Sequence, residues 1–178
     1  MFRAIAALAL ASASAHTSPA LNPASPWWER VTVTVSDDGR TRSCRYETSS
    51  SPESAQSCLV GASQASLAEA SSSSSGSKDE ITRITFERRF SPTPTSGLAA
   101  LQPGDTLLGG QMMALAIDGA GAVKNCKIVA TSGSVTPDYG CSEATAEHFS
   151  ASVPNGTASA ERQGYMTILV YGHSEHVV

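Results

Sequence analysis

The sequence predicts an α+β fold built from two similar units, each with the order strand, strand, helix, strand. Residues 36–58 and 119–141 share one pattern: a turn containing glycine, a strand that carries a cysteine, and a second cysteine about fifteen residues further on. An alternating apolar stretch precedes each turn, and this alternation beside a Gly-containing turn is typical of a β-hairpin. We therefore expect two ββα-β units with antiparallel sheets, each held together by one disulfide.

The two hairpins can be superposed without gaps when Cys44 is placed on Cys126. The alternating apolar positions then coincide, with Val31, Val33 and Val35 on Met113, Leu115 and Ile117. Self-similarity at a fixed offset is the sequence signature of a repeat. We expect residues 26–90 and 111–173 to form the two units, and residues 91–110 to connect them.

Each hairpin is followed by a signal for the start of a helix. Ser51-Pro52-Glu53 and Thr136-Pro137-Asp138 each read as an N-cap residue, a proline in the first helical turn and an acid favoured by the helix dipole. The second cysteine of each unit would then lie in a short helix that faces the hairpin. Strands at 81–90 and 165–172 complete the units, which form either two small lobes or one shared antiparallel sheet.

The cysteines are expected to form two disulfides in an exported chain, and they are Cys44, Cys58, Cys126 and Cys141. Three connectivities exist, and the repeat favours Cys44–Cys58 and Cys126–Cys141. Each bond would tie a helix to its sheet, which is worth about 3 kcal/mol in the chain-entropy model. A zinc site is the alternative, but the cysteines form no C-x-x-C pair and the histidines lie elsewhere, so no metal is expected.

The N-terminus has the features of a signal peptide. Met1-Phe2-Arg3 is a short basic start, residues 4–15 are apolar and small, and Ala13-Ser14-Ala15 fits a signal-peptidase site before His16. A retained membrane anchor is the alternative, although this run is shorter than the roughly 20 apolar residues that span a bilayer. We expect residues 1–15 to be removed, and the mature chain, without an integral membrane span, to be exported to the periplasm.

Composition and motifs argue against several functions. The formal net charge is −4 and the Lys and Arg residues are not clustered, so nucleic acid is not an expected partner. No serine lies in a G-x-S-x-G or S-x-x-K motif with a matching base, and no Gly-rich loop leads from a strand into a helix, so neither an enzyme nor a cofactor is expected. Glu147-His148 is a conceivable acid–base pair, but we expect His148 to pack at the edge of the sheet beside Phe149. His173 and His176 lie in a tail that we expect to be solvated.

The second unit resembles the TonB C-terminal domain, the periplasmic module of energy transducers. The resemblance rests on MMALAIDGAGAVKNCKIVATSGS, TPDYGCSEATAEHF and GYMTILVYG, which match that family's strand, D-x-x-G turn, serine-rich strand end, Pro-led helix and closing strand. The first unit is a degenerate copy. The resemblance implies an α+β module that binds partners through a sheet edge, above all outer-membrane transporters. The family's anchor helix and Pro-rich spacer have no counterpart here, so energy transduction itself is not expected.

We therefore expect a non-catalytic periplasmic protein-binding module that is linked to envelope transport. The last strand is the expected open edge on which a partner segment pairs, and its alternate side chains are Tyr165, Thr167, Leu169 and Tyr171. Trp27 and Trp28 are further candidates, because neighbours in a strand point to opposite faces and one indole would stay partly exposed. Pairing between the edges of two copies would give a homodimer.

Two other functions remain open. One is an exported structural or inhibitor-like protein whose disulfide-bonded units block a site on a partner. The other is a small hydrolase that uses His148, which requires His148, an acid and a hydroxyl to converge in a pocket.

Overall fold

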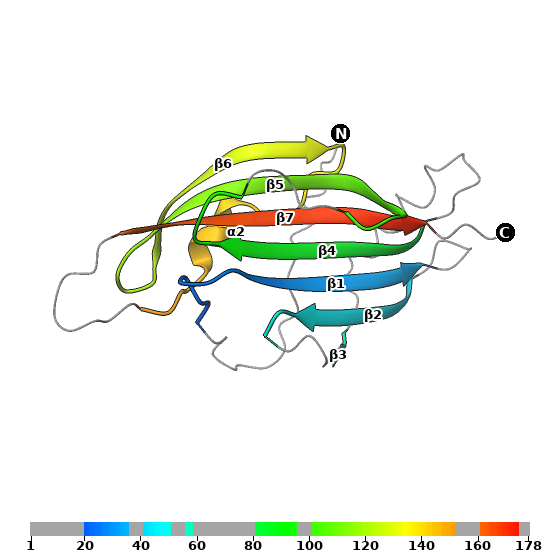
Figure 1. The fold of residues 1–178 in the computed structure, drawn as a ribbon, viewed down its shortest axis with the longest axis horizontal. Coiled ribbons are helices and arrows are strands. Elements are labelled where there is room, and N and C mark those ends of the chain that lie inside the picture. The colour runs from blue at the N-terminus through cyan, green and yellow to red at the C-terminus, as the bar shows by residue number, and fades with distance from the viewer. Residues whose placement is uncertain are drawn as a thin grey trace, which may run out of the picture.

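The described residues form one sheet of seven strands, in which every neighbouring pair is antiparallel (Figure 1). The computed structural model describes residues 20–35, 41–50, 56–58, 81–95, 101–151 and 161–174. The elements are β1 (Trp27–Val35), β2 (Thr41–Thr48), β3 (Gln56–Ser57), β4 (Ile81–Ser91), β5 (Asp105–Ile117), β6 (Val123–Gly133), α2 (Cys141–Ala146) and β7 (Arg162–Ser174). Across the sheet the order is β3-β2-β1-β4-β7-β5-β6.

The predicted α+β fold is wrong, because the described residues are mostly β-sheet and contain one helix of six residues. That helix begins only at Cys141, since Gly140 before it is extended and serves as the N-cap. It ends at Ala146, since Glu147 is extended again. The alternating apolar segments, which form strands of up to 13 residues, therefore determine the fold more strongly than the helix-start signals do.

The strand order of the first half is repeated in the second half. β1 lies between β2 and β4, and β5 lies in the same way between β6 and β7. The hairpin registers also agree, because Val33 is opposite Cys44 and Leu115 is opposite Cys126. The gap-free superposition of the two hairpins is thus reproduced in three dimensions, although the halves share one sheet and do not form separate ones.

The two halves meet at β4 and β7, and their junction has an approximate two-fold axis. Ile84 of β4 is opposite Val33, and Gly164 of β7 is opposite Leu115. Because Val33 and Leu115 are equivalent in the two hairpins, Ile84 and Gly164 are equivalent as well. Four residues further along each strand, the equivalent positions are Arg88 and Ile168, and these two residues are opposite each other. The axis therefore passes through the Arg88–Ile168 pair at the centre of the sheet.

The two faces of the sheet differ in character. α2 packs on one of them, which we call the helix face, and Figure 1 shows α2 behind the strands. The side turned to the viewer is the arginine face, which carries Arg30, Arg45, Arg83 and Arg89. The core lies on the helix face, and its fully buried side chains include Phe90, Met113, Leu115, Ile117, Phe149 and Met166.

The turn between β5 and β6 has the geometry that its D-x-x-G sequence predicts. Oδ1 of Asp118 accepts hydrogen bonds from the amides of Ala120 and Ala122, both 2.9 Å long. Gly121 has a φ of +90°, and a Cβ at this position would lie 1.8 Å from the carbonyl oxygen of Phe149. Glycine is therefore required both by the turn and by the segment that packs against it.

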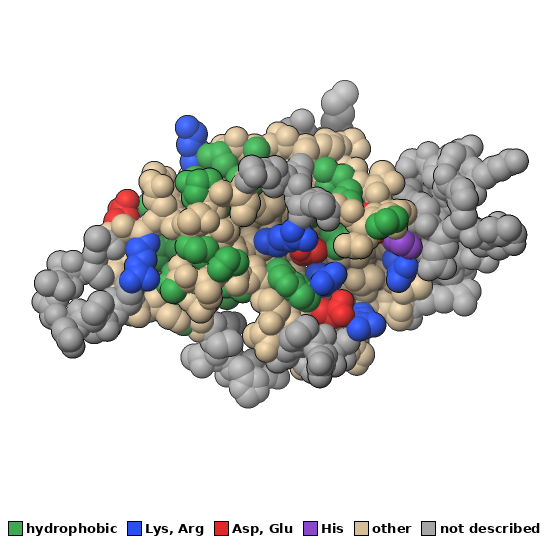
Figure 2. All heavy atoms as spheres, viewed as in Figure 1, with side chains coloured by type: hydrophobic (Ala, Val, Ile, Leu, Met, Phe, Trp, Pro, Cys, Tyr) green, Lys and Arg blue, Asp and Glu red, His purple; other side chains and the backbone are tan. Residues whose placement is uncertain are grey.

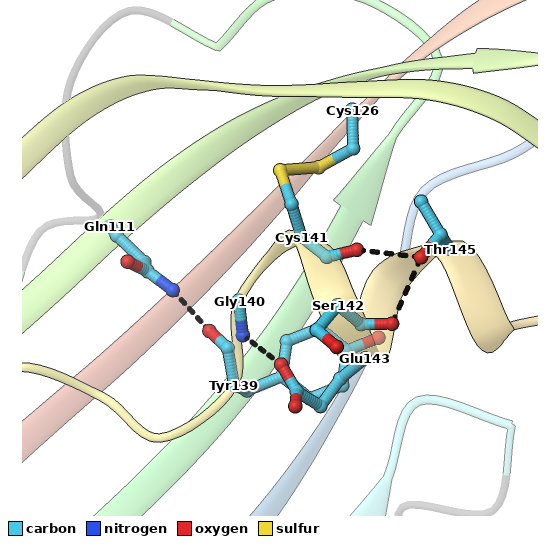
Figure 3. The surroundings of a disulfide bond; sticks show 8 residues. All are labelled: Gln111, Cys126, Tyr139, Gly140, Cys141, Ser142, Glu143 and Thr145. Carbon is cyan, nitrogen blue, oxygen red and sulfur yellow. Dashed lines mark hydrogen bonds between the residues drawn. A yellow bond between two sulfur atoms is a disulfide. The ribbon is translucent and has the colours of Figure 1, made fainter.

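The disulfides are Cys44–Cys58 and Cys126–Cys141, the connectivity that the repeat favours. Cys141 is the first residue of α2, so its bond to Cys126 ties the helix to β6 (Figure 3). Cys58 directly follows β3, so the expectation that it lies in a helix is wrong. Each half is thus closed by its own covalent link on the helix face.

Several expectations fall outside the described residues. They concern the signal peptide at 1–15, the first hairpin turn at 36–40, the helix start at 51–53 and the tail beyond residue 174. In the part of the chain that is described, no helix has the length and apolar character needed to cross a membrane.

Candidate functional site

The last strand is in the middle of the sheet and not at its edge. β7 pairs with β4 on one side and with β5 on the other along nearly its whole length. The expectation that this strand is an open edge is therefore wrong, because its backbone has no free side on which a partner strand could pair. The apolar run Ile168-Leu169-Val170 is the signal for this position, since strands buried on both faces have continuous apolar runs.

The four side chains expected at that edge all lie on the arginine face, and three of them are buried. Thr167, Leu169 and Tyr171 are 6%, 1% and 9% exposed, and Tyr165 is half-buried. The hydroxyl of Tyr171 donates a hydrogen bond of 2.9 Å to Glu87, which is itself buried. These residues pack within the sheet, and Tyr171 also borders a small cavity.

The two tryptophans point to opposite faces, as their adjacent positions in β1 predict. Trp27 lies on the helix face, where its ring stacks on Phe90 with 5.7 Å between the ring centroids. Trp28 lies on the arginine face, where the guanidinium carbon of Arg30 is 4.1 Å from its ring centroid. Trp27 therefore belongs to the border of the core, and the half-buried Trp28 is paired with a cation.

β6 forms an outer edge of the sheet. It pairs with β5 on one side, and no described strand lies on its other side. Ile128 and Val129 are 46% and 47% exposed, and they are the large hydrophobic side chains that stay exposed among the described residues. The register shifts between Met113, opposite Ile128, and Met112, opposite Ala130, so that Val129 forms a bulge. The edge thus presents apolar side chains beside unpaired backbone groups.

The opposite edge of the sheet is partly closed by the chain itself. The two residues before the second disulfide cysteine of the first half form β3, which pairs with the middle of β2. The equivalent segment of the second half, Tyr139–Gly140, leads into α2 and has no ladder with β6. Figure 3 shows how it is held, with the side chain of Gln111 donating to the Tyr139 carbonyl and the Gly140 amide donating to Glu143. Among the described residues, no strand covers the β6 edge, which is therefore open in this part of the chain.

An ion cluster on the helix face joins the two halves. A terminal nitrogen of Arg88 lies 2.5 Å from a carboxylate oxygen of Glu29, and Arg88 also binds Glu147. The hydroxyl of Tyr46 donates to Glu29 at 3.0 Å, and burial together with Glu29 raises the pKa of Tyr46 to about 12. Burial alone would lower the pKa of Arg88, but Glu29, Tyr139 and Glu147 hold it above its ordinary value.

This cluster does not form the acid–base site that a hydrolase would need. The hydroxyl of Tyr139 accepts a hydrogen bond from Arg88 and donates one of 2.8 Å to Glu147. Burial raises the pKa of Tyr139 above its ordinary value, so this hydroxyl stays neutral. Glu147 binds Arg88, and His148 is exposed, so the expectation that His148 packs beside Phe149 is wrong. The cluster positions the α2 segment over the sheet.

Charged side chains gather over the middle of the arginine face, as Figure 2 shows. Glu87 binds Nε of Arg89 in addition to Tyr171. His173 was expected in a solvated tail but lies in β7, where its Nδ1 is 2.9 Å from Oδ1 of Asp105. Among the described residues, no three side chains of the metal-binding types are grouped.

Comparisons with known proteins give no match. No family model matches the chain, and neither a curated protein nor a solved structure matches it. The resemblance of residues 111–173 to the TonB C-terminal domain therefore stays a prediction.

Proposed function

We propose that the protein is a non-catalytic protein-binding module of the cell envelope, in which β6 pairs with an extended segment of a partner protein. The observation that carries this proposal is the open edge of β6, where Ile128 and Val129 are exposed. In strand addition the main-chain hydrogen bonds supply affinity, each contributing about 0.5–1.5 kcal/mol, and alternate side chains supply selectivity. The equivalent edge of the first half is partly covered by β3, so the two halves have different roles in this proposal.

The charges on β6 favour a partner segment with acidic residues over a second copy of this edge. Lys124 and Lys127 are exposed, and β6 contains no acidic residue. Like charges that face each other across two strands are destabilising. Lysines and bulges on an edge strand are also known devices against self-pairing. A homodimer through β6 is therefore disfavoured, whereas an acidic extended segment would be attracted.

We place the partner among exported and outer-membrane proteins, with a transporter as the first candidate. Two disulfides support an oxidising compartment such as the periplasm, because such bonds rarely persist in the cytosol. The signal-peptide features of residues 1–15 support export. The resemblance of residues 111–173 to the TonB C-terminal domain supports a role in envelope transport.

The proposal is tested by adding the same charge to the two equivalent strands. Val129→Glu places a carboxylate on the open edge of β6, and Ser43→Glu places one at an exposed position of β2. Extended peptides selected on the wild-type protein should bind V129E about 10-fold more weakly, because an acid on β6 repels an acidic segment and an apolar contact is lost, and should bind S43E as before. Amide hydrogen exchange along β6 should slow when the peptide is bound.

Equal binding by the two variants, or protection on a strand other than β6, would contradict strand addition at this edge. If the protein bound folded envelope proteins tightly and no extended peptide, the inhibitor-like function would be favoured instead.

A further inference from the structure

A small cavity opens on the arginine face, between β1, β4, β7 and the residues that precede β5. Its volume is about 140 Å³, and its polar lining consists of Arg30, Glu87, Arg89, Gln102, Asp105 and Tyr171. The register of the sheet explains this set, because Arg30 is opposite Glu87, and Arg89 lies two residues further along the same face of β4. Arg30 and Arg89 are thus diagonal neighbours, a spacing that two long side chains can bridge.

The acidic groups of the cavity already have partners. Glu87 is 3% exposed, and its two oxygens accept from the Tyr171 hydroxyl and from Nε of Arg89. Oδ2 of Asp105 accepts a hydrogen bond of 3.1 Å from the backbone amide of Gln102, and Oδ1 of Asp105 lies 2.9 Å from Nδ1 of His173. A cationic ligand would therefore compete with bonds that exist within the protein.

The arginines, in contrast, retain unused donors. Arg30 makes no hydrogen bond to another described residue, and its nearest carboxylate oxygen, on Glu47, is 3.7 Å from Nε. That distance exceeds a hydrogen bond, and the guanidinium is instead stacked on Trp28. Arg89 binds Glu87 through Nε. Its terminal amino groups have no acceptor among the described residues. Guanidinium donors left in this way match the two oxygens of an oxyanion.

We propose that this cavity binds a carboxylate, held between the guanidinium groups of Arg30 and Arg89. Two arginines and two acids line the cavity, so their formal charges cancel and a singly charged group is favoured over a doubly charged phosphate. The volume corresponds to about five water molecules, which is enough for a carboxylate with a short carbon chain. The carboxylate comes either from a small organic acid or from an Asp or Glu side chain of a partner. The site is separate from β6, and its test does not depend on the function proposed for that strand.

The test is a titration of the full chain with acetate at constant ionic strength. The Nε–H signals of the arginines in NMR spectra report the contact, and the fluorescence of Trp28 beneath Arg30 provides a second signal. We expect saturable binding of acetate that weakens about 10-fold in Arg30→Gln, because a charge-assisted bidentate contact is lost. Arg45→Gln is the matched control, since Arg45 lies on the same face, pairs with Glu47 and does not line the cavity.

A conservative pair of variants guards against a change in folding. Arg30→Lys keeps the charge but loses the planar fork, so it should also weaken acetate binding, whereas Arg45→Lys should not. Absence of saturable binding, equal losses in R30Q and R45Q, or wild-type affinity in R30K would overturn the proposal. Phosphate that binds as tightly as acetate would also overturn it. Tighter binding of a capped glutamate than of acetate would support a partner's side chain as the source, and the reverse would support a free organic acid.

Discussion

Replacing Arg88 by methionine is expected to destabilise the protein strongly, because this side chain joins the two halves. The substitution keeps the apolar stem and leaves Glu29 and Glu147 without their cation. Breaking a buried ion pair by removing one partner costs about 3–5 kcal/mol. The side chains of Arg88, Glu29 and Glu147 are 13%, 21% and 24% exposed, so water still reaches the acids, and we expect the lower limit, about 3 kcal/mol.

In a chain of this size, a loss of about 3 kcal/mol should lower the thermal midpoint by about 6–12 °C. Urea unfolding of wild type and R88M measures the difference in free energy. The control is Arg45→Met, whose ion pair with Glu47 involves an arginine side chain that is 62% exposed and should be worth less than about 1 kcal/mol. In the background of R88M, Glu29→Gln should cost less than it does in wild type, since it removes an unpaired acid. If R88M and R45M were equally stable, the cluster would not join the halves energetically.

Three further predictions concern the covalent and polar links. Replacing both Cys126 and Cys141 by serine should cost about 3 kcal/mol in urea unfolding for a loop of 15 residues, and the Cys44–Cys58 pair should cost a similar amount. The Ala122 amide and Lys124 lower the pKa of Asp118, so Asp118→Asn should reduce the thermal midpoint at neutral pH. That difference should disappear as the pH falls through the folded pKa. Burial and Glu87 raise the pKa of Tyr171 to about 12, so Tyr171→Phe should cost about 1.5 kcal/mol below pH ~10. This cost should vanish in alkaline titrations as the pH rises through about 12. An effect of D118N that is independent of pH, or of Y171F that persists in strong alkali, would refute the assigned causes.

The hairpins and disulfides could be predicted because their signals are local. The period-two pattern fixes which residues face the same side, and one shared register then follows from aligning Cys44 with Cys126. The D-x-x-G turn is likewise stabilised locally, by hydrogen bonds from backbone amides of the turn to the Asp118 side chain. Within each half, the sequence therefore determines how the first two strands pair.

The position of the third strands could not be predicted in the same way. Whether β7 is an edge depends on β4, whose pairing with it is set by contacts far apart in the chain. The burial of Glu87 and the ion pairs of Arg88 are similarly hidden in the sequence, because Tyr171 and Glu147 belong to the other half. Within the strand itself, the signal for an interior position is the short continuous apolar run of residues 168–170.

The two-fold axis at the Arg88–Ile168 pair has a consequence for how such a sheet could arise. Two identical chains, each with a hairpin and a third strand, would form an isologous dimer with this strand order if their third strands paired antiparallel. Joining the two chains through residues 92–104 turns that association into an intramolecular step, which no longer depends on protein concentration. Once joined, the halves are free to diverge at equivalent positions. One half can then close its outer edge with β3 while the other keeps β6 open.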